Sequence, residues 1–277
     1  MSSFLNPGSE TAEAALKMAK VFPVTVEIVA FSASHRGLTQ GCGPTTYSAG
    51  RTNGGPPTLE RRLVGGIHHG ANTVDWGILV PPEGYLKRMY EECKKRDMLV
   101  IMDEAQTDVG RTDKMVSFED EDIVPDILCL SKTPRCSLPL ASVRTKAEIA
   151  HGLSESKFLW LTTHLNDPLT AAVGDKVFEI VERDNIAHRA AERGEHLRAG
   201  LVKLQDKGSA DLGQLISNEA RVLGLSCNVV NLPVIGDVFR LAPPVTVTAN
   251  VIDVGLSILD EAFASIPARS LVNHRIE

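Results

Sequence analysis

Two segments of this 277-residue sequence place a reactive side chain directly after a short apolar run. The run in MLVIMDEA is followed by Asp103, and the run in DILCLSKT is followed by Ser131 and Lys132. Because parallel α/β sheets bind ligands at the carboxyl ends of their strands, we expect both side chains at one sheet edge. A lysine there can form an imine with a carbonyl compound, and the carboxylate can hold a protonated ring nitrogen. The alternative is a surface lysine in a loop and an acidic residue that merely ends a strand.

The start of the first predicted helix is a third candidate for chemistry. Residues 11–20, TAEAALKMAK, combine strong helix formers with apolar residues at helical spacing. Gly8 and Ser9 precede this helix, and the backbone N–H groups of a helix N-terminus bind anions such as phosphate. The alternative is an ordinary helix start with Ser9 as its N-cap residue.

Strands and helices alternate along most of the sequence, which predicts an α/β fold with a mostly parallel sheet flanked by helices. We expect a large domain of residues 1–185 and a small C-terminal α+β domain of residues 186–277. Residues 51–75 are rich in glycine and proline with little periodicity, which predicts an irregular connection or the scar of a deletion. Strands are expected at 24–33, 98–103, 126–131 and 140–145, helices at 84–97 and 146–152, one or two long helices at 167–208, and strand, strand and helix at 225–266.

Composition narrows the class of protein. The formal net charge is -6 and the isoelectric point is about 5.8, which argues against nucleic acid or an anionic membrane as a partner. No apolar run approaches the roughly 20 residues that span a bilayer. The five cysteines form no CxxC pair, which favours reduced thiols and a cytoplasmic location. No GxGxxG or GxxxxGK[ST] motif follows a strand, which disfavours a dehydrogenase.

Several segments occur in an order that resembles one enzyme family. They are LNPGSETAEAALKMAK, IVAFSASHRGLT, MDEAQTDVGRTDKM, VPDILCLSKT, TTHLNDPLTAAVG and DVFRLAPPVTV. Together they resemble the class III aminotransferases of pyridoxal-phosphate fold type I. Within that family the sequence is most similar to the 2,2-dialkylglycine decarboxylases, which decarboxylate a dialkyl amino acid and then transaminate an α-keto acid.

The resemblance implies roles for residues around the cofactor, pyridoxal 5'-phosphate. Lys132 matches the Schiff-base lysine, which also moves protons during the reaction. Asp103 matches the partner of the pyridinium nitrogen, and Gln106 matches the contact to the ring hydroxyl. Gly8 and Ser9 match the loop that binds the cofactor phosphate.

Further roles follow from the same resemblance. Thr163 matches a phosphate contact donated by the neighbouring subunit, so a homodimer or homotetramer is implied. Arg240 matches the arginine that pairs with the substrate carboxylate, with a surface arginine as the alternative. His35 takes the position of an aromatic ring stacked on the cofactor, with a polar loop residue as the alternative. Thr163, Leu165 and Asp167 match three ligands of an alkali-metal ion.

The sequence also departs from the family. A segment before LNPGSE, a core strand between Arg51 and Trp76, and a stretch between Gly208 and Leu223 are expected to be missing. The glycine-rich stretch after Lys132 is replaced by PRCS. Losing a central strand costs several kcal/mol, against a total stability of roughly 5–15 kcal/mol. We therefore expect either a rearranged sheet or a partial gene product.

These observations predict a pyridoxal-phosphate-dependent aminotransferase or decarboxylation-dependent transaminase. Its substrates would be an amino acid and an α-keto acid acceptor. The alternative is a catalytically inactive, shortened homologue that binds a full-length enzyme.

Overall fold

The computed structural model describes residues 1–22, 28–30, 35–46, 66–70, 81–204, 212–232 and 236–266. The chain divides into two compact units, Met1–Ala187 and His188–Glu277. Each unit has its own hydrophobic core. No helix among the described residues is long and apolar enough to cross a membrane.

The first unit is built on a six-stranded mixed sheet in the order β1-β6-β5-β4-β3-β2. Strands β2 to β5 run parallel to one another, whereas β6 runs antiparallel to β5 and β1 antiparallel to β6. The predicted α/β class is confirmed, with an antiparallel edge added to the parallel strands. The strands are β1 (Ser2–Leu5), β2 (Val29–Ala30), β3 (Gly66–Gly70), β4 (Leu99–Asp103), β5 (Ile127–Leu130) and β6 (Ala141–Thr145).

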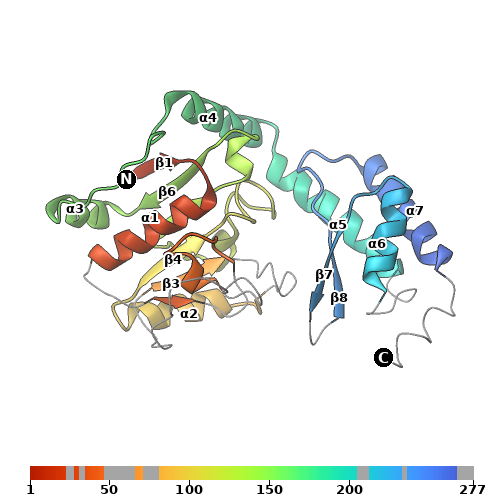
Figure 1. Ribbon diagram of the computed structural model, residues 1–277, viewed down its shortest axis with the longest axis horizontal. Coiled ribbons are helices and arrows are strands. Elements are labelled where there is room, and N and C mark those ends of the chain that lie inside the picture. The colour runs from red at the N-terminus through yellow and green to blue at the C-terminus, as the bar shows by residue number, and fades with distance from the viewer. Residues whose placement is uncertain are drawn as a thin grey trace. The chain divides into compact units, whose positions relative to one another are not determined.

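Helices cover both faces of this sheet (Figure 1). Side chains alternate between the two faces along a strand, so Ile101 packs against α1 (Gly8–Val21) while Val100 and Met102 pack against α2 (Tyr85–Lys94). Helix α3 (Ala147–Glu155) joins the core on the α1 side through Ile149 and Leu153. Because β4 is covered on both faces, its apolar run is continuous up to Asp103.

The prediction that residues 51–75 are wholly irregular is wrong for Gly66–Gly70. These residues form β3, which pairs in parallel with both β2 and β4, so that Gly70 lies opposite Asp103. Backbone hydrogen bonds from two neighbouring strands define this element, and its sequence GIHHG carries little strand propensity of its own. The position between β2 and β4 is therefore filled. The rest of 51–75, and residues 24–27 and 31–33 of the first predicted strand, lie outside the described residues.

The start of α1 also differs from the prediction. The N-cap residue is Pro7, with φ -97° and ψ 162°, and its carbonyl accepts hydrogen bonds from the N–H groups of Glu10 and Thr11. Ser9 is therefore inside the first turn of the helix and is not the N-cap. Strand β1, which immediately precedes this turn, was not expected from the sequence.

The long helical region predicted at 167–208 forms two helices, α4 (Pro168–Arg183) and α5 (Ile186–Leu204). They are separated at Asn185, which has a left-handed φ of 48°. The second unit also contains α6 (Gly213–Val222), the antiparallel hairpin β7 (Asn228–Leu232) and β8 (Gly236–Arg240), and α7 (Ala249–Ser265). The predicted strand, strand and helix are confirmed, whereas α6 was not expected.

Candidate active site

Asp103, the last residue of β4, is a buried carboxylate that remains ionised at neutral pH. Its side chain is 9% exposed, and Oδ1 accepts a hydrogen bond of 3.2 Å from the N–H of Ala105. Burial raises the pKa of Asp103 to about 6, while the Ala105 N–H and the positive charges of Lys132 and Arg36 act to lower it. A carboxylate that is buried and still charged at pH 7 suits the binding of a cationic N–H group.

Lys132 follows β5 in an uncommon backbone conformation. Its φ is 62° and its ψ is -80°, and the N–H of Thr133 donates a 2.8 Å hydrogen bond to the carbonyl of Ser131. These are the features of a γ-turn of the rare, strained type centred on the lysine. The side chain is exposed to solvent, and its charge acts on Asp103. Strain of this kind persists only where the surrounding structure holds it in place.

The N-terminus of α1 lies against the turn that carries Lys132. A Cβ atom added to Gly8 would lie 2.8 Å from the Oγ of Ser131. A Cβ atom added to Gly37, whose φ is 128°, would lie 2.2 Å from the Oγ of Ser9. Glycine is therefore required at Gly37, and a side chain at Gly8 would force the Ser131 hydroxyl to move. The first N–H groups of a helix have no acceptor within the helix, so this end of α1 offers donors for an anion.

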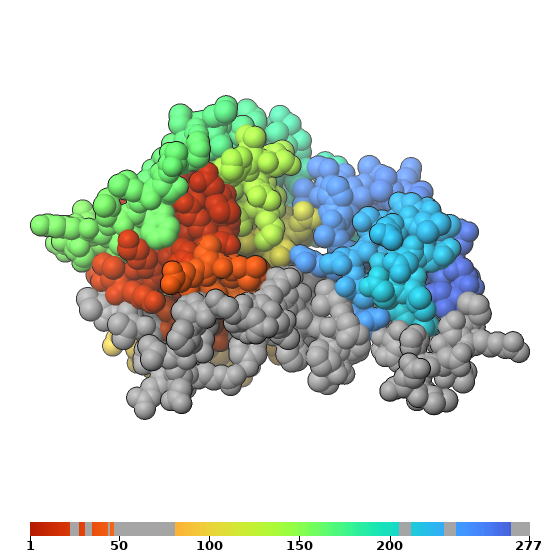
Figure 2. Space-filling view, viewed as in Figure 1, coloured from red at the N-terminus to blue at the C-terminus, as the bar shows by residue number. Residues whose placement is uncertain are grey.

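Residues 35–46 close over the same end of α1, and Figure 2 shows this orange segment beside the red N-terminal part of the chain. The carboxylate of Glu13 on α1 accepts hydrogen bonds from the N–H groups of Gly41 and Cys42, at 2.6 and 3.2 Å. These bonds tie the segment to the helix. The loop after β2 is thereby held next to the candidate anion site.

Arg36 is a functional candidate that the sequence did not single out as a charged group. Its side chain is 3% exposed, and its guanidinium donates to the carbonyl of Thr45. Burial lowers the pKa of Arg36 to about 10 against the attraction of Asp103, so the group stays cationic at neutral pH. His35 beside it is half-buried. The sequence shows only that Arg36 lies in a loop before Gly37, and the neighbouring residues do not predict that its side chain is buried.

A network around Glu104 holds the loop that follows β4. Glu104 is fully buried, and its carboxylate accepts hydrogen bonds from the hydroxyl of Thr107 and from Ser117, whose N–H and Oγ lie at 3.1 and 2.6 Å. Gln106, half-buried, belongs to the same loop. These hydrogen bonds connect the start of the loop after Asp103 to Thr107 and Ser117.

The predicted residues of the 163–167 segment lie elsewhere, near the β1 edge of the sheet. Asn166 in this segment accepts a 2.8 Å hydrogen bond from the N–H of Phe4. Thr163 is exposed and Leu165 half-buried. Asp167 is the N-cap of α4, where its Oδ1 accepts from the N–H of Leu169 at 3.1 Å. Among the described residues no group of three His, Cys, Asp or Glu side chains could hold a metal ion.

Arg240 is the last residue of β8 in the second unit, where it is half-buried and lies opposite Asn228. Of the predicted residues, Asp103 and Lys132 interact through their charges, Gly8 adjoins Ser131 in the turn of Lys132, and Ser9 adjoins Gly37. Gln106 lies in the loop that follows Asp103, and His35 lies two residues before Gly37. The assignment of Thr163, Leu165 and Asp167 to a metal ion stays a prediction.

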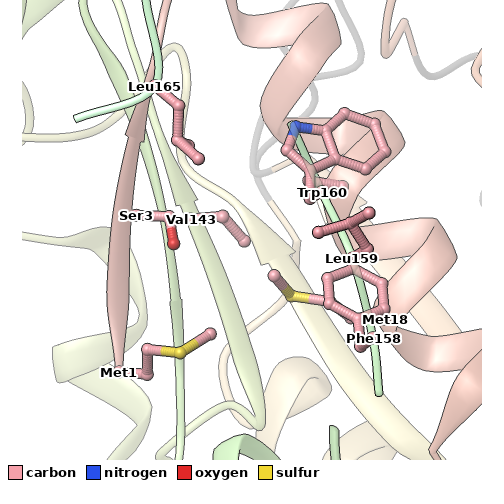
Figure 3. A pocket seen from close by; sticks show the side chains of 9 residues that line it. Met1, Ser3, Met18, Val143, Phe158, Leu159, Trp160 and Leu165 are labelled. Atoms are coloured by element: carbon pink, nitrogen blue, oxygen red, sulfur yellow. The ribbon is translucent and has the colours of Figure 1, made fainter. Parts of the chain in front are cut away.

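A separate cavity of about 160 Å³ opens beside β1 and β6 (Figure 3). Its lining has no ionisable side chain and includes neither Asp103 nor Lys132, so it lacks groups for acid–base chemistry. In Figure 3 one side is formed by Met18, Phe158, Leu159 and Trp160, and the other by Met1, Ser3, Val143 and Leu165.

Comparisons with known proteins identify the family and the fold of the chain. An uncharacterised aminotransferase of Schizosaccharomyces pombe is 37% identical, over 94% of this chain and 72% of its own length. The acetylornithine aminotransferase of Agrobacterium fabrum is 30% identical, over 70% of this chain and 51% of its own length. The chain thus spans about half of that second relative.

A solved ornithine aminotransferase from Toxoplasma gondii has the same fold, with a TM-score of 0.86 and 21% identity over 96% of this chain and 72% of its own. The ω-transaminase of Pseudomonas jessenii, solved in complex with PMP, gives a TM-score of 0.84 at 20% identity, over 95% of this chain and 74% of its own. The sequence model of the family described as aminotransferase class-III matches residues 73–263. The chain belongs to the class III aminotransferase family.

Proposed function

We propose that this protein is a pyridoxal-phosphate-dependent transaminase that moves an amino group from an amino acid to an α-keto acid. The observation that carries the proposal is the pairing of Asp103, buried and ionised at neutral pH, with Lys132 at one sheet edge. Family membership makes pyridoxal phosphate the expected cofactor.

The residues at this edge fit the three polar parts of that cofactor. The end of α1 at Gly8 and Ser9 would supply N–H donors for the phosphate, next to Ser131 in the turn of Lys132. Asp103 would hold the protonated pyridine nitrogen, and Gln106 would contact the ring hydroxyl. The amine of Lys132 is the group that can bond to the aldehyde carbon.

When bound, the cofactor would supply the electron sink that lets the substrate Cα release a proton or carbon dioxide while the bonding electron pair stays on the substrate. Lys132 would then take the proton from Cα and return it at the acceptor's carbon. A cationic ring N–H next to Asp103 would favour the ionised form of this carboxyl group. The buried cation of Arg36 helps to keep Asp103 ionised.

Arg240 would bind the carboxylate of the amino acid, since a guanidinium pairs with a carboxylate through two parallel hydrogen bonds. Thr163 would contact the phosphate bound to a second subunit, so the active form would be a homodimer or homotetramer. His35 would lie against the cofactor ring. A hard alkali-metal ion near Thr163, Leu165 and Asp167 would compete with the capping role of Asp167 at α4.

The resemblance to dialkylglycine decarboxylases supports a finer proposal, that decarboxylation precedes transamination for dialkyl substrates. Incubation with 2-aminoisobutyrate and pyruvate separates the two reactions. Carbon dioxide and alanine would form together in the decarboxylating case. A plain transaminase would accept ordinary amino acids and release no carbon dioxide.

Titration of the purified protein with pyridoxal phosphate tests the proposal. We expect a visible absorbance band that is lost in Lys132→Ala, and its conversion on addition of an amino acid donor. A folded, saturated protein that shows neither change would contradict transamination. Mixing such a protein with a full-length homologue, followed by size-exclusion chromatography, would then test the role of an inactive binding partner.

A further inference from the structure

We infer that Asp108 is a positioning residue for Lys132, because its carboxyl group holds the turn around the lysine and governs the protonation of the lysine amine. This inference rests on the proposed function, in which that amine bonds to an aldehyde. Asp108 lies in the loop after β4 and has no part in the cofactor contacts proposed above.

A backbone hydrogen bond from the residue before Lys132 ends on this carboxyl group. The N–H of Ser131 donates to Oδ2 of Asp108 at 2.8 Å. Lys132 is the centre of the γ-turn that follows. Such a backbone conformation costs about 1–3 kcal/mol and needs contacts that hold it. Asp108 supplies one such contact, at the first residue of the turn.

Burial of the Asp108 carboxyl group costs free energy that its packing does not offset. Asp108 is fully buried, and its Oδ1 has no hydrogen-bond partner among the described residues. Burying an acceptor without a partner costs about 1–3 kcal/mol. A buried polar group kept at this cost is a candidate for a functional role.

The charges around Asp108 link it to the lysine. The pKa of Asp108 is raised to about 8, chiefly by burial and also by the charge of Glu104, while hydrogen bonding from the Ser131 N–H and the positive charge of Lys132 oppose the rise. Arg111 also feels the charge of Asp108. Above pH 8 the group is mainly a carboxylate, and its negative charge favours the ammonium form of Lys132. Asp103 acts on Lys132 in the same direction.

Two substitutions of Asp108 separate the effect of its hydrogen bond to Ser131 from the effect of its charge. Asp108→Asn keeps an acceptor for the Ser131 N–H and nearly the same volume, but removes the charge. Asp108→Ala removes both. Asp113→Asn is the matched control, because Asp113 is an exposed acid of the same loop.

The experiment follows the capture of pyridoxal phosphate by Lys132 between pH 7 and 10. The amine attacks the aldehyde carbon, water leaves, and borohydride reduces the C=N bond to a stable secondary amine that mass spectrometry counts. In Asp108→Asn the midpoint of the rate–pH profile should fall by about one pH unit with a plateau like that of the wild type. In Asp108→Ala the plateau should fall about tenfold as well, because the turn is no longer held.

An unshifted midpoint in Asp108→Asn would overturn the inference, whatever Asp108→Ala does. The near-isosteric variant keeps the test usable if Asp108→Ala does not fold. If the wild type itself gives no adduct at Lys132, the proposed function fails. An adduct at Lys132 together with an unshifted rate–pH profile in Asp108→Asn would contradict only the role inferred for Asp108.

Discussion

Replacing Asp103 by asparagine should make the cofactor-free protein more stable at neutral pH while weakening its hold on the cofactor. The folded protein keeps a proton on Asp103 up to about pH 6, whereas the ordinary value is 3.8. Each pKa unit corresponds to about 1.4 kcal/mol, so ionisation in the folded state costs about 3 kcal/mol. Asparagine mimics the protonated form and avoids this cost.

The sign of the effect follows from proton binding. Between pH 4 and 6 the folded state binds more protons at Asp103 than the unfolded state does, so the stability of the wild type falls as the pH rises through this window. The asparagine variant does not titrate there. The difference in unfolding free energy should be near zero below pH 4 and about 3 kcal/mol in favour of the variant at pH 7.5.

Urea unfolding of cofactor-free protein at pH 4 and 7.5, followed by circular dichroism, measures this difference. Asp126→Asn is a control of opposite sign. Burial alone would raise the pKa of Asp126, but hydrogen bonds from Lys146, Lys94 and the N–H of Val100 lower it. Its neutralisation should destabilise the protein at pH 7.5. An Asp103→Asn variant no more stable than the wild type at pH 7.5 would refute the reasoning.

Three other substitutions test the loops that shape the site. Ser137→Gly should raise the unfolding free energy by about 0.5–1 kcal/mol, because the exposed Ser137 has a left-handed φ of 73° that glycine adopts without strain; a loss in urea unfolding would contradict this. Ser117→Ala should cost about 1.5–3 kcal/mol by leaving buried Glu104 short of a donor, and an unchanged urea midpoint would count against that network. Gly37→Ala should lower the unfolding free energy by about 2 kcal/mol or more, since its Cβ would lie 2.2 Å from the Oγ of Ser9. The variant should also be less sensitive to inorganic phosphate as a competitor of cofactor binding, and a stability equal to that of the wild type would contradict the close approach.

Much of the site's frame could be predicted from the sequence. The apolar runs before Asp103 and Lys132 indicated buried parallel strands, and β4 and β5 end where those runs end. Buried strands carry their signal in their own composition, which is why these two were predictable. The helix α1 was equally visible from its residues.

Elements that depend on distant partners could not be predicted in this way. Strand β3 exists through its pairing with β2 and β4, and β1 through its pairing with β6, far along the chain. The γ-turn at Lys132 depends on a carboxyl group from the preceding loop, so the residues around the lysine give no sign of it. The burial of Arg36 is likewise a tertiary effect.

The identity of the modified residue tests the central claim most directly. Wild-type protein saturated with pyridoxal phosphate is treated with borohydride, digested and mapped by mass spectrometry. The predicted result is one adduct, on Lys132 in the peptide that contains DILCLSK, and its complete loss in Lys132→Ala. An adduct on another lysine, or equal labelling of the wild type and Lys132→Ala, would contradict the assignment of Lys132 as the cofactor-binding lysine.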